Sequence, residues 1–393
     1  ACLGLFFWAG YRRIFAEVPY RHSLWSFLGE ECAPGQRRAI VRALLAGLPG
    51  DSGAMAWILT MAALCLGGAG ALFWYLVFSL LWLHPLGALA GLWCYYQPGC
   101  GGRVELSALL EGILCRKRAR ARPGLGRLLR WLQTLALCGM LPLLFRILAS
   151  PSAPARGAGL LPWLVVLLAL WLLCRLVGER GETVLSLLFL LLLAAALLGN
   201  LPNLIPAVKL VLLDAFDRSR FLFSLSGAGL AAALQAGGAA GCGGALLRTL
   251  SAREEGPSFA HPAQAAFYEE LRGLLQLTVQ LALGLLFLCA RLVPEDNRWP
   301  QTCLWAFLCL FGLLWLGRAV RALARPEGRR CGLLCLGLVG AAAVWDIWKG
   351  TALLPGLSGG AAGLASLALA GLLLFDSNWY FLLLEHYRDV HIW

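Results

Sequence analysis

The sequence VLSLLFLLLLAAALLGNLPNLI, residues Val184–Ile205, indicates whether this chain folds in water or in a lipid bilayer. The run contains no charged residue, and a helix needs about 20 apolar residues to cross the hydrocarbon core of a bilayer. Within that core a helix satisfies its backbone hydrogen bonds inside one segment. We therefore interpret the run as a transmembrane helix.

The whole chain shares this apolar character. Of its 393 residues, 60% are hydrophobic and 14% are charged, and the mean hydropathy is +0.74. Soluble globular domains are roughly 45–50% apolar and about 25% charged. Disordered chains contain still fewer apolar residues. The composition therefore excludes both classes and predicts an all-α, multi-pass integral membrane protein, without indicating which membrane contains it.

Other apolar runs extend this prediction along the chain. Ala54–Tyr96 has no charged residue, and it can hold either two short spans with a tight turn or one span and a re-entrant segment. Its possible breaks are Gly67, Gly68, Gly70 and His84-Pro85. The further candidate spans are Leu128–Leu148, Leu160–Val177, Phe221–Leu247, Leu271–Val293, Gln301–Leu316, Cys331–Trp348 and Leu354–Leu374. The sequence thus predicts a bundle of about ten transmembrane helices, within a range of about 8–12.

Basic residues indicate how the bundle is oriented. The chain has 33 Lys and Arg residues against 21 Asp and Glu, a net charge of +12, and inner loops of membrane proteins are enriched in Lys and Arg. Arginines concentrate in residues 103–130 and 318–330, and an even number of candidate spans separates these regions. Both regions and both termini are therefore expected on the inner side. The predicted loop Lys209–Arg220 fits least well, because Asp214 and Asp217 offset its basic residues.

Some of these basic residues are expected to bind lipid. Anionic head groups attract clusters of basic side chains beside a membrane span. The predicted contacts with anionic lipid are Arg116, Lys117, Arg118, Arg120 and Arg122. Nucleic acid is not an expected partner, because no basic run is interleaved with exposed aromatic residues.

The sequence divides into three regions. Residues 1–53 form a basic, partly amphipathic N-terminal region, residues 54–384 the transmembrane helical domain, and residues 385–393 a short polar tail. The N-terminal region is not expected to be a secretory signal, because arginines follow its short apolar run Leu3–Gly10 instead of preceding it.

One segment of the N-terminal region has the pattern of an amphipathic helix. Gln36–Leu48 carries Arg37, Arg38 and Arg42 near one face of the expected helix and apolar residues on another. A basic amphipathic helix often lies in the membrane interface. A soluble or partner-bound helix is the alternative.

A few polar residues are candidates for a site within the membrane, because polar and ionisable groups in a span are costly and usually functional or paired. His84 precedes a proline in an apolar run, and Asn200 and Asn203 lie at the end of the Leu-rich run. Asp346 and Lys349 are three residues apart and can pair on one helix face. Each also has a structural interpretation, as a kink, an exit turn or the interfacial end of a span.

Glycines spaced four residues apart predict close helix packing. The pairs are Gly237 with Gly241 and Gly359 with Gly363. Small residues at this spacing let helix backbones approach each other in lipid. A loose, kinked span is the alternative.

Motifs for catalysis or cofactor binding are not found. The sequence has no H-E-x-x-H, P-loop or EF-hand pattern. Residues 356–360 match G-x-S-x-G, but a hydrolase elbow needs a strand before its serine, and here Pro355 precedes the match and a helix-like run follows. Cys331 and Cys335 are expected to share a helix face, yet two thiols make a poor metal site. We therefore expect no catalytic residue, cofactor or metal, and an enzyme is the less expected class.

Two functions agree with these observations. The first is a non-catalytic structural or accessory subunit of a larger membrane complex, favoured by the scarcity of charge within spans and by 16 tryptophans. The alternative is a transporter or channel for a non-ionic or weakly polar solute, favoured by spans that glycine and proline interrupt. Ion-coupled transport is disfavoured, because it usually needs charged groups near the bilayer midplane. Membrane lipids and other membrane subunits are the expected partners.

Overall fold

The computed structural model describes residues 34–47, 54–77, 79–80, 179–217, 262–292 and 329–349, with Leu172 and short pieces of helix within residues 131–138 and 303–314. Almost all of these residues are α-helical, and none of them lies in a strand. The prediction of an all-α fold is therefore confirmed for the described part of the chain. The number of spans stays a prediction, because many candidate runs lie outside these ranges.

The long helices follow the apolar runs of the sequence. They are α3 (Pro34–Gly47), α4 (Ala54–Gly67), α9 (Glu179–Gly199), α10 (Leu201–Ala215), α12 (Pro262–Leu292) and α14 (Arg329–Lys349). A further helix covers residues 69–77, and residues 79–80 are also helical. The helices predicted at Gln36–Leu48, Leu271–Val293 and Cys331–Trp348 are confirmed as α3, α12 and α14, although α12 begins earlier than expected.

Two of the described helices are long and apolar enough to cross a membrane, at Gly181–Gly199 in α9 and Leu271–Cys289 in α12. Much of the apolar surface of α9 is exposed, at Val184, Leu187, Leu188, Leu191 and Leu198. Soluble monomers rarely expose contiguous apolar surface of this extent. Together with the composition of the chain, these helices indicate an integral membrane protein.

The Leu-rich run Val184–Ile205 is not one helix, as the sequence predicted, but parts of two. α9 ends at Gly199, the chain turns at Asn200, and α10 begins at Leu201 with a proline in its first turn. Proline is tolerated there because the first turn of a helix needs no N–H donor. The segment expected to be a loop from Lys209 is also helical, since α10 continues to Ala215.

α4 and the helix of residues 69–77 form a helical hairpin. The chain reverses at Gly68, which has a φ of +81°, a left-handed conformation that glycine adopts without a steric penalty. The predicted break near Gly67 and Gly68 is therefore confirmed. α4 has 14 residues. At 1.5 Å per residue it is about 21 Å long, shorter than the ~30 Å hydrocarbon core of a bilayer. The choice between two short spans and a re-entrant segment stays a prediction.

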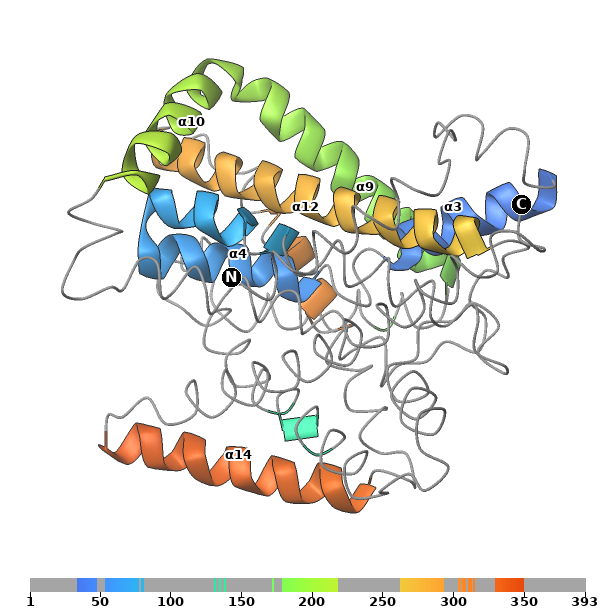
Figure 1. Ribbon diagram of the computed structural model, residues 1–393, viewed down its shortest axis with the longest axis vertical. Coiled ribbons are helices and arrows are strands. Elements are labelled where there is room, and N and C mark those ends of the chain that lie inside the picture. The colour runs from blue at the N-terminus through green and yellow to red at the C-terminus, as the bar shows by residue number, and fades with distance from the viewer. Residues whose placement is uncertain are drawn as a thin grey trace, which may run out of the picture.

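Figure 1 shows how the described helices are arranged. α12 lies at the centre of the main group and packs on α4, α9 and α10, and α3 packs on α9. The N-terminal part of α12 contacts α3, where Tyr268 joins a small cluster with Ile40 and Leu44. α14 lies on the opposite side of the molecule from α9 and α10 (Figure 1).

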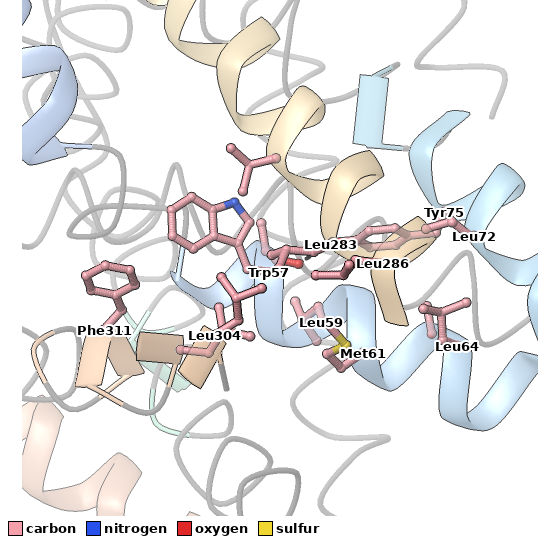
Figure 2. Close-up of a cluster of buried hydrophobic side chains, with 14 of the residues drawn as sticks. Trp57, Leu59, Met61, Leu64, Leu72, Tyr75, Leu283, Leu286, Leu304 and Phe311 are labelled. Carbon is pink, nitrogen blue, oxygen red and sulfur yellow. Dashed lines mark hydrogen bonds between the residues drawn. The ribbon is translucent and has the colours of Figure 1, made fainter. Parts of the chain in front are cut away.

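The largest buried side chains lie where the hairpin meets α9, α12 and the helical residues near 310. They are Trp57, Tyr75, Phe189, Phe311 and Leu72. Figure 2 shows Tyr75 and Leu72 beside Leu283 and Leu286 of α12, with Trp57 at the other end of α4. Much of the hairpin is therefore buried against these helices.

Candidate functional site

Buried polar side chains gather along one face of α12. Arg272, Gln276 and Gln280 are spaced four residues apart, which places them on the same side of the helix. Their exposed fractions are 5%, 1% and 0%, respectively. We call these three residues the polar face of α12. They are polar residues within or at the start of a segment apolar enough to span a bilayer.

One helical turn beyond Gln280, Gly284 brings α12 against the hairpin. A Cβ atom on Gly284 would lie only 2.5 Å from Cδ1 of Leu72, so a larger residue does not fit without movement of that leucine. The helix of residues 69–77 begins at the hairpin turn, whereas α12 begins beside α3 and ends near that turn (Figure 1). The two helices are therefore antiparallel, and the level of Gln280 along α12 corresponds to that of Tyr75.

The hairpin contributes hydroxyl groups at this level. The Tyr75 hydroxyl donates a hydrogen bond of 2.6 Å to the carbonyl oxygen of Ala56, and the Thr60 hydroxyl donates one of 2.9 Å to the same oxygen. The Ser79 hydroxyl lies beside that of Tyr75, and Thr60, Tyr75 and Ser79 are all fully buried. The hairpin and α12, which pack on each other, thus both bury uncharged polar groups.

Gln280 is the most unusual of these buried polar residues. Among the residues that the structure describes, neither its Nε2 nor its Oε1 atom has a hydrogen-bond partner, and its side chain is fully buried. A carboxamide offers two N–H donors and an oxygen acceptor. Leaving a buried polar group unsatisfied costs about 1–3 kcal/mol. The energetics therefore favour a hydrogen-bonding molecule at Gln280.

The hairpin turn is fastened to the end of α10. The Gly70 N–H donates a hydrogen bond of 2.8 Å to Oδ2 of Asp214, and the Trp74 indole N–H donates one of 2.9 Å to the carbonyl of Ala215. The ring of Phe216 packs on Trp74, with centroids 6.0 Å apart. A carboxylate beside the first turn of a helix is favourable, because the N-terminal end of the helix dipole is positive.

Replacement of Asp214 tests this fastening. Asp214→Ala removes the acceptor of the Gly70 N–H, and we expect it to lower the free energy of unfolding by about 1 kcal/mol, as loss of a helix cap does. Asp214→Asn keeps an acceptor and loses only the charge, so a smaller loss of about 0.3–1 kcal/mol is expected. Thermal unfolding in detergent measures both. An Asp214→Asn loss larger than that of Asp214→Ala would contradict the assigned hydrogen bond.

The structure separates the polar residues that the sequence singled out. Asn200 is part of the turn between α9 and α10, where its Nδ2 donates to the carbonyl of Ala196 at 2.8 Å and its own carbonyl accepts from the Asn203 N–H at 3.0 Å. Asp346 and Lys349 lie at the end of α14, on the other side of the molecule (Figure 1). Lys349 Nζ lies 4.4 Å from the centre of the Trp348 ring.

The other predicted site residues lie outside the described residues. These are His84, the packing glycines Gly237, Gly241, Gly359 and Gly363, and the basic residues Arg116, Lys117, Arg118, Arg120 and Arg122.

Sequence reasoning missed the polar face of α12. The signal was present, because Arg272, Gln276 and Gln280 recur every four residues within the predicted span Leu271–Val293. A search for charged groups within spans passes over two glutamines, which carry no charge. The role of Asp214 was also missed, because its partner Gly70 lies 144 residues away in the sequence.

No group of three or more His, Cys, Asp or Glu side chains among the described residues is arranged to hold a metal ion. Cys331 and Cys335 share a face of α14, and Cys138 lies close to both. Cys138 and Cys335 are buried in the hydrophobic core.

Comparison with known proteins does not assign the chain to a family. No protein-family model matches it, and no curated protein sequence matches it. Among solved structures, a crystal structure of a mutant manganese transporter from Eremococcus coleocola is similar over 90% of this chain and 78% of that chain, with 16% identity and a TM-score of 0.43. A similarity this distant does not establish a shared family.

Proposed function

We propose that this protein transports small uncharged polar solutes across a membrane, as a channel or a carrier. The observation that carries this proposal is the fully buried amide of Gln280, which has no hydrogen-bond partner among the described residues and lies on the helix that packs on α4. Polar groups inside a membrane protein are costly and usually functional. The proposal includes the multi-pass topology of about ten spans that the sequence predicts.

The hairpin supports a transport role. Non-helical backbone at membrane depth is tolerated only where it is buried in protein or lines a water-filled cavity. Interrupted helices often form the binding sites of transporters for this reason. Here α4 ends at Gly67, shorter than a span, and side chains on opposite faces of it are buried, Trp57 and Thr60 on one face and Leu59 and Ala63 on the other.

The kind of solute follows from the side chains. Hydroxyls and carboxamides donate and accept hydrogen bonds but carry no charge. Transporters of ions usually place charged groups near the bilayer midplane. Arg272 is the charged member of the polar face, and it lies at the start of the apolar segment Leu271–Cys289, where a span meets the interface. The interior polar groups therefore fit a neutral solute better than an ion.

Reconstitution of the full chain into liposomes tests this function. We expect labelled urea, acetamide and glycerol to enter these vesicles faster than protein-free vesicles of the same lipid, for at least one of the three solutes. Sodium or potassium current through the same membranes is expected to stay at the protein-free level. Uptake of all three solutes at the protein-free rate would overturn the proposal.

A structural or accessory subunit of a larger membrane complex is the second candidate. The described surface of α14 favours it, because this helix packs through a narrow stripe of Cys335, Val339 and Ala342. Its large apolar side chains are exposed at Leu333, Leu334, Leu336, Leu338, Val344, Trp345 and Trp348. Such a surface fits either lipid or the apolar helices of other subunits. Purification in a gentle detergent as a stoichiometric complex, combined with no solute flux, would favour this function over transport.

A further inference from the structure

We propose that the carboxamide of Gln280 binds the transported solute, and that the preferred solutes are small neutral amides such as urea and acetamide. This inference rests on the proposed transport function and narrows it to one chemical class. The observation that carries it is a fully buried side chain whose donor and acceptor both lack a partner among the described residues.

A carboxamide displays its N–H donor and its carbonyl acceptor side by side in one plane. A second amide presents the complementary edge, so two parallel hydrogen bonds satisfy both atoms of Gln280 at once. A single hydroxyl, as in glycerol, forms fewer well-aligned bonds with this edge. A site built to form a hydrogen bond discriminates strongly against a molecule that leaves its buried polar groups unpaired.

The surroundings of Gln280 favour a neutral partner. Gly284 and Gln276 are its neighbours on the same face of α12, and neither carries a charge. Arg272 is eight residues away on that face, and at 1.5 Å per residue the separation along the helix is about 12 Å. Across the antiparallel contact, Tyr75 lies at the same level, with its hydroxyl proton donated to the Ala56 carbonyl.

The fold itself does not use the Gln280 amide for any hydrogen bond that the structure shows. An apolar side chain of similar shape should therefore be tolerated, because replacing an unsatisfied polar group in this way is often neutral or stabilising. This property separates a binding role from a structural one. If the glutamine held the helices together, its replacement would lower the free energy of unfolding.

The experiment compares Gln280→Met with the wild-type chain in liposomes. Methionine keeps an unbranched side chain of similar length and removes the amide. We expect uptake of urea and acetamide to fall by about tenfold or more, uptake of glycerol to change less, and the thermal unfolding midpoint not to fall. Gln280→Asn keeps the amide on a side chain one carbon shorter, and it should retain more amide uptake than Gln280→Met.

The control is Thr278→Val, two residues away on the exposed side of α12, where the hydroxyl bonds to the carbonyl of Leu274 in its own helix. Its uptake of all solutes should equal that of the wild type. Unchanged amide uptake in Gln280→Met would overturn the inference and assign the amide to a buried water. An equal fall for glycerol and amides, or a lower unfolding midpoint, would overturn it in favour of a structural role. If the wild-type chain transports none of these solutes, that result overturns the proposed transport function itself, before the role of Gln280 is tested.

Discussion

Trp57→Ala is expected to lower the free energy of unfolding by about 3–5 kcal/mol, the range for removing a large aromatic side chain from a core. Trp57 is 1% exposed, and its ring stacks on Phe189 with centroids 5.0 Å apart and meets Phe311 edge-on at 5.8 Å. It therefore joins α4 to α9 and to the helical residues near 310, with Leu283 of α12 beside it (Figure 2). Alanine would leave a cavity among three separate parts of the chain.

The matched control is Trp348→Ala in α14. Trp348 is 71% exposed, and its described contacts are the Trp345 ring at 5.8 Å and the Lys349 ammonium. Surface substitutions usually change stability by less than about 0.5 kcal/mol. Thermal unfolding of both variants in the same detergent gives the comparison. Equal losses for Trp57→Ala and Trp348→Ala would mean that the aromatic cluster around Trp57 is not part of the folded core.

Gly70→Ala is the second substitution for which we expect a large loss. A Cβ atom at this position would lie 2.5 Å from the backbone nitrogen of Ala215 and 2.6 Å from the carbonyl carbon of Asp214. Backbone atoms cannot rotate away as the end of a side chain can. The hairpin turn must therefore separate from α10, at a cost of about 1–3 kcal/mol or more, as for other overpacked sites.

Gly340→Ala provides the control for that substitution. Gly340 lies within α14, and a Cβ atom there would have no neighbour within 4 Å. Alanine is the better helix former by about 1 kcal/mol, so the unfolding midpoint should stay the same or rise. If Gly70→Ala were as stable as Gly340→Ala, the close contact between the hairpin and α10 would be wrong.

The helices of this protein could be predicted from local patterns, but their ends could not. Apolar runs of sufficient length located α9, α12 and α14, because a span in lipid requires such a run. The same rule predicted one helix where the structure has α9 and part of α10. Hydropathy alone does not reveal the turn at Asn200, which Pro202 follows in the first turn of α10. The helical hairpin was one of two alternatives, and the positive φ of Gly68 belongs to that arrangement.

The candidate site was harder to predict for two reasons. Gln276 and Gln280 are uncharged, so they do not stand out in a search for buried ionisable groups. Its geometry also depends on contacts between distant segments, such as Gly284 against Leu72. The four-residue spacing of the polar face of α12 could have been recognised. The lack of a partner for the Gln280 amide depends on the three-dimensional packing alone.

The bond between Gly70 and Asp214 bears on the order in which the chain assembles. It closes a loop of 144 residues, and the entropic cost of loop closure must be met before such a contact stabilises the fold. During synthesis the hairpin leaves the ribosome long before α10 and α12, which enclose it. Until α10 is made, the Gly70 N–H lacks the acceptor that Asp214 provides in the folded chain. Docking of the hairpin is therefore expected to be a late step in the maturation of the protein.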